Sequence, residues 1–478
     1  MSINHRRISV AIASSLVLEL INKISPLLIL HHAQKNLGLT EFGWSQYQLA
    51  IFEIIQPFVS YGFANYALAE TSAAGCSQDR VRRIFTHIML LKIFHAVVVS
   101  SLYLLNRKLN GAPIADLYSL GILLLVVGSA VTDVFWYCIL QHKLAKFTLL
   151  SGILRILAML LILFFIKTTA DSRLFVCLML LPNAMIAISS GVYAFSQLKF
   201  GTIDWQFLKI IFSKSTPFAL VVLLVTLVDR VDIFLVEKFF GLDAAGSYAG
   251  PAKIIQSLSL IAASLALPFY AEMLKVHDAH SLAKHTKLSL WFLSALIVPI
   301  VFGLPFIEGD VLQLVFSNLP SPANHLLSSL AIGMIGNIFV TVFGLQILIA
   351  KARPFRLSIG AGATLIFIPT VVWLTKDWFG YQAVAYSLVL GKIGFGLSCV
   401  YYSREFLPKT PWLSFIKPVL AGVAMAGFLS LLRVDGLGLN ILAGGVSYSV
   451  CLLLINFKEF LDILQHPKVL NVWNRWRL

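Results

Sequence analysis

Charged side chains inside long apolar segments are the residues of this sequence with the most evident chemical potential. Glu19 and Lys23 stand at positions i and i+4, so on a helix they share one face, with the acid N-terminal to the base. Asn22 and Pro26 flank that face, and the proline frees a backbone carbonyl and kinks the helix. This group either neutralises itself as an ion pair or lines a polar cleft.

A second set of charges lies further along the chain. Asp229, Arg230 and Asp232 form a cluster inside an apolar run. Glu53 stands just before a proline, and Lys253 just after one. Kinked helices that carry buried charge are typical of a moving, water-filled cleft. The alternative for the cluster at 229–232 is that it only closes the outer end of its helix.

The elements that position these charges follow from composition. Apolar residues make up 58% of the 478 residues and charged residues 12%, against about 45–50% and 25% in soluble chains. A chain this short of charge cannot cover a soluble surface, so lipid is its solvent. This excludes a cytosolic enzyme, a secreted domain and a nucleic-acid module. It also makes each intramembrane charge costly, at roughly 2.5 kcal/mol or more near the bilayer centre.

A membrane-spanning helix needs roughly 20 residues, and helices satisfy all backbone groups in lipid. The apolar runs show no strand alternation, so the sequence predicts an all-α polytopic membrane protein with about fourteen transmembrane helices. We place the helices near 8–30, 43–67, 84–105, 114–140, 147–167, 174–198, 215–238, 246–272, 286–307, 325–350, 354–375, 380–402, 413–432 and 438–456.

Acids and bases within these spans are equal in number. They are Glu19, Lys23, Glu53, Lys92, Asp116, Asp133, Arg155, Asp229, Arg230, Asp232, Lys253 and Lys392. Lys92 and Arg155 lie in peripheral helices, where they either form interhelical pairs with Asp133 or backbone carbonyls, or serve a cavity.

Loop Lys and Arg residues set the orientation, because cytoplasmic loops are enriched in them. With the N-terminus inside, basic residues crowd the inner segments around 80–83, 143–146, 199–214, 275–287, 351–356, 404–417 and 458–477, and are sparse in the outer ones. The excess charge of +15 is therefore a topology signal. We read the N-terminal stretch as a retained span and predict that both termini are cytoplasmic.

A short repeat divides the chain. Gly38-Leu39 with Gly43, and Gly241-Leu242 with Gly246, both read G-L-x-x-x-G at the outer turn of a helical hairpin. Two halves in one orientation indicate a parallel duplication. The predicted units are a six-helix bundle at 1–200, a second at 208–403, two added helices at 413–456 and a cytoplasmic interfacial tail at 457–478.

Local motifs add a family resemblance. They are Asn22 to Leu30 with Leu37-Gly38 and Phe42-Gly43, and Val228 to Phe234 with Phe240 to Leu242, Ala245-Gly246 and Tyr248. With the span layout, the chain resembles the Wzx-type O-antigen flippases of the multidrug/oligosaccharidyl-lipid/polysaccharide (MOP) superfamily. The resemblance implies a two-lobed, MATE-like bundle with a cationic cavity opening alternately to each side of the bacterial inner membrane.

The resemblance also implies a substrate and site roles. Family members flip undecaprenyl-pyrophosphate-linked oligosaccharide, whose diphosphate needs Arg or Lys and whose sugars need amides and aromatics. The implied substrate-binding residues are Lys23, Arg230, Lys253 and Asn22. The residues implied in coupling to H⁺ or Na⁺, or in neutralising those bases, are Glu19, Glu53, Asp229 and Asp232. The equal number of acids and bases within the spans departs from a cationic cavity. Association with a polysaccharide polymerase and a chain-length regulator is a further expectation.

Two other functions compete with the flippase. A cation-coupled multidrug or small-solute exporter of the same superfamily would have a cavity dominated by carboxylates, against which the bases argue. A membrane enzyme, such as an O-antigen polymerase or lipid-sugar glycosyltransferase, usually needs a long outer loop, and the loops here are short. Histidines in the loops lack an acid or Cys shell, so no metal or cofactor is expected.

Overall fold

The computed structural model describes residues 29–71, 77–109, 111, 116–141, 143–266, 269–270, 273, 276, 278–316, 325–407, 409, 411–432 and 436–455. Glu19, Asn22 and Lys23 lie outside the described residues, as do nearly all of the predicted first span and the tail at 457–478. Every secondary-structure element of the described part is a helix.

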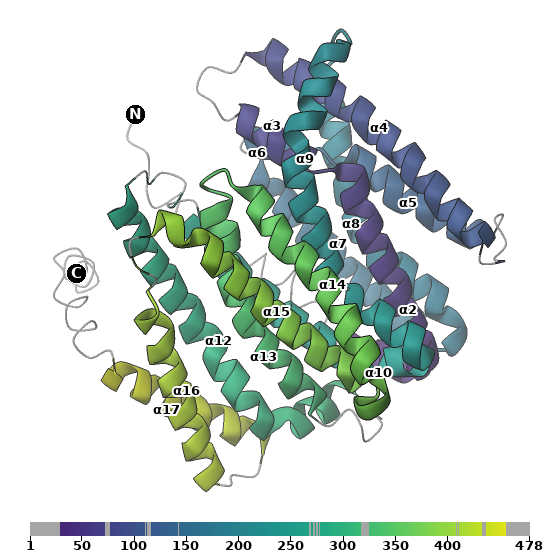
Figure 1. The fold of residues 1–478 in the computed structure, drawn as a ribbon. Coiled ribbons are helices and arrows are strands. Elements are labelled where there is room, and N and C mark those ends of the chain that lie inside the picture. Colours follow the sequence, from purple (N-terminus) through teal and green to yellow (C-terminus); the bar gives the residue numbers. More distant parts are fainter. Residues whose placement is uncertain are drawn as a thin grey trace, which may run out of the picture.

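The helices follow one another with short connections (Figure 1). They are α2 (Leu30–Ser60), α3 (Phe63–Thr71), α4 (Gln78–Leu109), α5 (Leu117–Thr132), α6 (Phe135–Leu140), α7 (Leu144–Phe165), η1 (Thr169–Asp171), α8 (Ser172–Gln197), α9 (Trp205–Val228), α10 (Val231–Leu265), α12 (Ala279–Val315), α13 (Leu326–Phe339), η3 (Val340–Leu348), α14 (Pro354–Phe379), α15 (Gln382–Ser403), η4 (Arg404–Phe406), α16 (Leu413–Leu432) and α17 (Leu437–Ile455).

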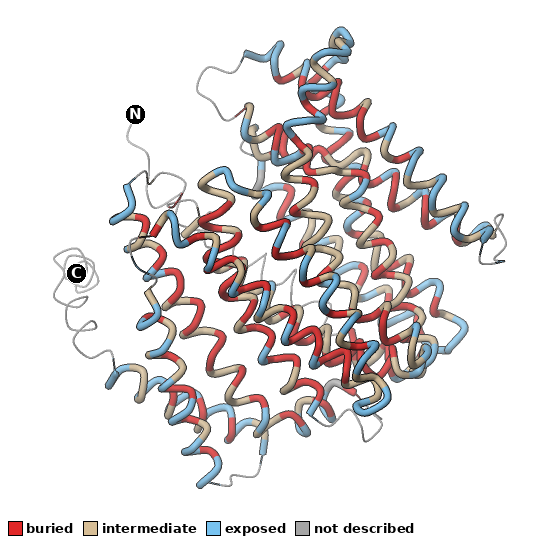
Figure 2. The backbone as a smooth tube through the Cα atoms, in the orientation of Figure 1, coloured by how far each residue is buried: buried red, intermediate tan, exposed pale blue. Residues whose placement is uncertain are grey.

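The arrangement confirms an all-α multi-pass membrane protein. Within the described residues, 10 helical stretches are long and apolar enough to cross a membrane. Large apolar side chains such as Ile366, Trp373 and Leu431 are mostly exposed, as expected of a surface in contact with lipid. Figure 2 shows buried residues concentrated on the inward faces of the helices. The total of fourteen spans stays a prediction.

Several predicted spans are interrupted. The span at 43–67 stops at Ser60, and Tyr61 and Gly62 take left-handed φ angles of 43° and 66° before α3 begins. The span at 215–238 breaks between α9 and α10, so that Asp229 and Arg230 lie outside both helices. Pro57 lies one turn before the first break, and it helps to explain why α2 ends there, since proline disrupts helical hydrogen bonding. Periodicity alone does not locate such breaks, because apolar patterning continues across them.

The two G-L-x-x-x-G hairpins pack against each other. Gly38 and Gly241 place left-handed bends inside α2 and α10, with φ angles of 74° and 82°. A Cβ at Gly43 would overlap the carbonyl oxygen of Leu242, and a Cβ at Gly246 would overlap that of Leu39. We call this reciprocal arrangement the hairpin contact.

A hydrogen bond crosses the hairpin contact between equivalent positions. The Thr40 hydroxyl donates to the carboxylate of Asp243, and the two residues are 203 positions apart. Gly38 and Gly241, and Gly43 and Gly246, are separated by the same interval. The sequence repeat is therefore also a structural one, and its two copies meet face to face.

Lys92 has a structural role. Its side chain is 2% exposed, and its ammonium donates to the backbone carbonyls of Ala130, at 3.0 Å, and of Asp133. These carbonyls lie where α5 ends and α6 begins, so they lack helical partners. The expectation that Lys92 pairs with backbone carbonyls is confirmed.

We expect Gly246→Ala to destabilise the protein, because the new methyl group meets backbone atoms that cannot move aside. Overpacking typically costs about 1–3 kcal/mol, whereas alanine otherwise favours a helix by up to about 1 kcal/mol. Thermal unfolding of the purified protein should therefore shift downwards. Gly445→Ala is the matched control, since it has open space at its Cβ position. Equal unfolding temperatures for Gly246→Ala and the wild type would contradict the close contact.

Candidate functional site

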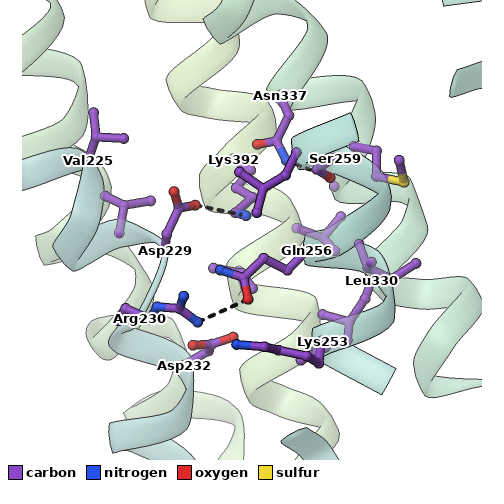
Figure 3. Close-up of a pocket in the computed structure, with 18 of the residues that line it drawn as sticks. Val225, Asp229, Arg230, Asp232, Lys253, Gln256, Ser259, Leu330, Asn337 and Lys392 are labelled. Atoms are coloured by element: carbon purple, nitrogen blue, oxygen red, sulfur yellow. Dashed lines mark hydrogen bonds and ion pairs between the residues drawn. The ribbon is translucent and has the colours of Figure 1, made fainter. Parts of the chain in front are cut away.

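The break between α9 and α10 opens onto two adjoining cavities, and Figure 3 shows side chains that line the larger of them. The larger, of about 240 Å³, lies toward α13 and α15 and includes Asp229, Asp232 and Lys392 in its lining. The smaller, of about 200 Å³, lies toward α2, α7 and α8 and includes Glu53 and Arg155. The two share further lining residues, namely Arg230, Lys253, Gln256 and Leu260. We call them together the chamber.

One carboxylate serves two bases at the junction of the cavities. Glu53 of α2 forms an ion pair with Arg230, and its other oxygen lies 3.9 Å from the Lys253 ammonium. The Arg230 guanidinium also donates to the Gln256 amide oxygen at 3.1 Å. Both bases are mostly buried, with side-chain exposures of 20% and 15%. Because Glu53, Arg230 and Lys253 come from separate segments, their grouping could not be derived from spacing.

The remaining acids of the cluster have different partners. Asp229 pairs with Lys392 of α15 at 3.1 Å. Asp232 is buried, and it accepts hydrogen bonds from the Tyr248 hydroxyl at 3.0 Å and from the Ile233 amide at 2.8 Å. Three neighbours in sequence therefore point to three sets of contacts, as the break in the helix allows.

Arg155 is a chamber residue to which sequence reasoning assigned no binding role. Its guanidinium donates to the side-chain oxygen of Asn183 at 2.8 Å, and both residues line the smaller cavity. The signal available in the sequence was an arginine in one apolar helix and an asparagine beside a proline in the next. Lys392 was likewise noted only as an intramembrane charge.

The charged lining favours an anion. It contains four bases and three acids, namely Arg155, Arg230, Lys253, Lys392, Glu53, Asp229 and Asp232. Guanidinium and ammonium groups side by side suit phosphate oxygens, which can replace a carboxylate as their partner. The amides of Gln256 and Asn337 add neutral hydrogen-bonding capacity for hydroxyl groups. Among the described residues, no group of three His, Cys, Asp or Glu side chains could hold a metal ion.

The chamber lies between two contacts along α2. The hairpin contact lies in the N-terminal half of the helix and Tyr61 follows its C-terminal end, with Glu53 in between. The Tyr61 ring stacks on Phe212 of α9 and on His95 of α4, with ring centroids 5.1 and 4.7 Å apart. We call this stack the aromatic contact.

An ion pair supports the aromatic contact. Glu70 of α3 bridges Lys214 of α9 at 3.1 Å and Arg80 at 2.6 Å. The hydrogen bond from Lys214 is the main cause that holds the pKa of Glu70 below its usual range. The carboxylate is therefore ionised at neutral pH and keeps α9 against α3.

Comparisons with known proteins agree with this architecture. The family model described as "Polysaccharide biosynthesis protein" matches residues 11–273. The structure of lipid II flippase MurJ in an inward closed conformation has a TM-score of 0.70 and 14% identity, covering 95% of this chain and 99% of that one. No curated protein sequence matches the chain.

Two structures of a Vibrio cholerae MATE transporter are also similar in fold. A point mutant of VcmN has a TM-score of 0.55 and 14% identity, covering 83% of this chain and 96% of that one. VcmN in the bent form has a TM-score of 0.50 and 16% identity, covering 85% and 99%. At these identities the likeness establishes a shared fold.

We expect Glu53→Gln to create a stronger site for a small anion, because the change frees Arg230 and Lys253 from their carboxylate. Inorganic pyrophosphate should raise the unfolding temperature of Glu53→Gln more than that of the wild type, since a ligand stabilises the state it binds. Glu70→Gln, which removes the acid of an ion pair outside the chamber, is the control and should behave as wild type. An equal response in all three proteins would argue against an exchangeable anion site.

Proposed function

The chain belongs to the polysaccharide biosynthesis protein family, and on that premise we propose that it is a flippase for lipid-linked oligosaccharide. The proposed substrate is an undecaprenyl-pyrophosphate-linked repeat unit, such as that of O-antigen, which moves from the inner to the outer leaflet of the bacterial inner membrane. The family match and the MOP-type fold support a flippase or transporter rather than an enzyme.

The observation that carries the proposal is the group formed by Glu53, Arg230 and Lys253. Two bases held by one shared carboxylate form a site that a diphosphate can enter by displacing that carboxylate. Arg155 adds a third base in the same cavity. The amides of Gln256 and Asn337 in the chamber can hydrogen-bond the attached sugars, while the lipid tail stays in the bilayer.

The two contacts around the chamber suggest how access alternates. Separation at the hairpin contact would open the chamber on the predicted outer side, and separation at the aromatic contact would open it on the inner side. Glu53 then has a role in release, because its return to Arg230 and Lys253 expels the headgroup. Protonation of Glu53 or its occupation by Na⁺ would couple that step to an ion gradient.

The exporter of cationic compounds is the weaker alternative. The fold likeness to a MATE transporter and the carboxylates of Glu53, Asp229 and Asp232 favour it. The bases of the chamber oppose it, because each of these acids is already paired with a base or held by hydrogen bonds.

Partners and placement complete the proposal. We place both termini in the cytoplasm, following the loop charges, and a polysaccharide polymerase and chain-length regulator next to the flippase at the outer face. Asn22, Lys23 and Glu19 keep their predicted roles in binding and coupling, on a span that lies outside the described residues.

Arg230→Ala, Lys253→Ala and Arg155→Ala should each lower surface polysaccharide at normal protein level. Loss of one charged hydrogen bond costs about 1.5–3 kcal/mol, which corresponds to roughly 10- to 150-fold in binding. The measurement is complementation of a deletion strain, with analysis of surface glycan and of undecaprenyl-linked intermediates. Lys209→Ala, an exposed lysine on α9, is the control.

The deletion strain itself tests the function. Finished repeat units that accumulate on the inner leaflet, with surface glycan lost, support the flippase. Unchanged glycan with altered drug sensitivity would instead support the exporter, and full complementation by all three chamber variants would refute the assignment of the chamber.

Glu53→Gln should block transport while substrate binding is retained or tightened, because the variant cannot displace the headgroup. Binding of a radiolabelled lipid-linked oligosaccharide to the purified protein, compared with transport in vesicles, separates the two steps. Normal transport by this variant would show that another acid, or none, drives release.

A further inference from the structure

A third pocket lies outside the chamber, where three elements of the first half of the chain meet. It has a volume of about 390 Å³ and is lined by residues of α2, η1 and α8. Those residues are Glu41, Trp44, Thr169, Ala170, Ser172 and Arg173. We call it the rim pocket. Nothing in the proposed transport step uses it.

The lining of the rim pocket is polar apart from the indole of Trp44 and the methyl group of Ala170. Trp44 is half-buried, and its ring lies 6.2 Å from that of Tyr118. The Arg173 guanidinium lies over the Tyr118 ring at 5.2 Å, where a cation–π interaction holds it. An aromatic ring, a guanidinium and hydroxyl groups therefore border one open space.

The two charges of the rim pocket do not neutralise each other. Within the part of the chain that the structure describes, neither Glu41 nor Arg173 lies within ion-pair distance of an oppositely charged side chain. Because the carboxylate of Glu41 and the guanidinium of Arg173 form no ion pair with each other, both can hydrogen-bond a ligand. The carboxylate accepts and the guanidinium donates, which suits a neutral ligand with many hydroxyl groups.

The walls of the rim pocket are held in place by hydrogen bonds. Asp171 accepts from the amides of Lys167 and Thr168 at 3.0 and 2.8 Å, which fixes η1. The carbonyl of Ile166 accepts from the side chains of His32, at 2.8 Å, and of Asn36, at 3.2 Å, which ties the end of α7 to the start of α2. A site with fixed walls loses little entropy on binding.

The rim pocket adjoins the hairpin contact. Trp44 directly follows Gly43, and the Thr169 methyl lies 4.0 Å from the Cβ position of Gly38. On the predicted topology, the turn around Gly38 to Gly43 and the segment around Thr169 both lie on the outer side of the membrane. The rim pocket therefore lies beside the opening through which a translocated glycan leaves.

We propose that the rim pocket is a carbohydrate-binding site for the oligosaccharide part of the translocated lipid. The inference rests on the proposed function. A sugar ring stacks its C–H face on Trp44, while Glu41 accepts from its hydroxyl groups and Arg173, Thr169 and Ser172 hydrogen-bond to the others. Binding there holds the glycan on the outer side as the hairpin contact closes, which favours forward transport.

The test uses the purified full-length chain in nanodiscs and a free oligosaccharide. The probe is the repeat unit of the host's surface polysaccharide, released by mild acid so that it carries neither lipid nor phosphate. Binding is measured by saturation-transfer NMR and calorimetry. We expect Trp44→Ala and Glu41→Gln to weaken binding at least tenfold and Trp44→Phe to weaken it less, because the ring is kept.

Two controls separate the rim pocket from other sites. Trp378→Ala removes a tryptophan that is 79% exposed at the end of α14 and should bind as wild type. Arg230→Ala should also bind the phosphate-free sugar normally, although it fails in transport. Absence of binding to the wild type would overturn the proposal, as would loss of binding in Arg230→Ala with normal binding in correctly folded Trp44→Ala and Glu41→Gln.

The outcomes distinguish this inference from the proposed function. Sugar binding that depends on Trp44, in a protein whose deletion leaves surface glycan unchanged, would uphold the site and refute the flippase. Transport that depends on Arg230, with sugar binding indifferent to Trp44 and Glu41, would uphold the flippase and refute the site.

Discussion

A charged side chain inside a helical bundle of low dielectric constant needs a partner. This requirement determines how the helices around the chamber are arranged. Arg230 and Lys253 meet Glu53, and Lys392 meets Asp229. Each pair joins segments far apart in the chain, so the ion pairs also hold α2, the α9–α10 break and α15 together. Because an unpaired charge there would be costly, the partners can part only when another ion or ligand takes a vacated place.

The contrast with Lys92 shows why burial of charge alone does not mark a ligand site. Lys92 is the more deeply buried base, yet backbone carbonyls freed at a helix break satisfy its ammonium. Arg230 and Lys253 instead border open volume and are held by a shared side-chain carboxylate, that of Glu53. A mobile partner and adjacent space are what allow exchange.

The backbone contributes as much as the charges. Gly43 and Gly246 have no side chain, so the two hairpins pack against each other through main-chain atoms. The Thr40 hydroxyl hydrogen-bonds to Asp243, its equivalent in the other hairpin, across this contact. At the other end of the chamber, Tyr61 and Gly62 in left-handed conformations end α2 and direct the Tyr61 ring onto α9. Close packing of this kind favours discrete open and closed arrangements over gradual deformation.

Much of this protein is determined by sequence alone. The lack of charge and the length of the apolar runs require helices in lipid, and the family motifs agree with the family match and with the fold shared with the lipid II flippase MurJ. Intramembrane charge together with the family resemblance selected Glu53, Asp229, Arg230, Asp232 and Lys253 as site candidates, and all five border the chamber. Local physics suffices here, because the cost of burying apolar or charged groups does not depend on which helix is the neighbour.

Only the tertiary structure shows which side chains form hydrogen bonds and ion pairs with each other. The sequence did not show that Arg155 would bond Asn183, that Lys392 would pair with Asp229, or that Asp232 would turn to Tyr248. It also did not locate the interruption at Asp229 and Arg230, since the apolar pattern runs through it. The physical reason is common to all four. Where a helix breaks or bends, and which side chains then come within reach of each other, follows from the packing of the whole bundle.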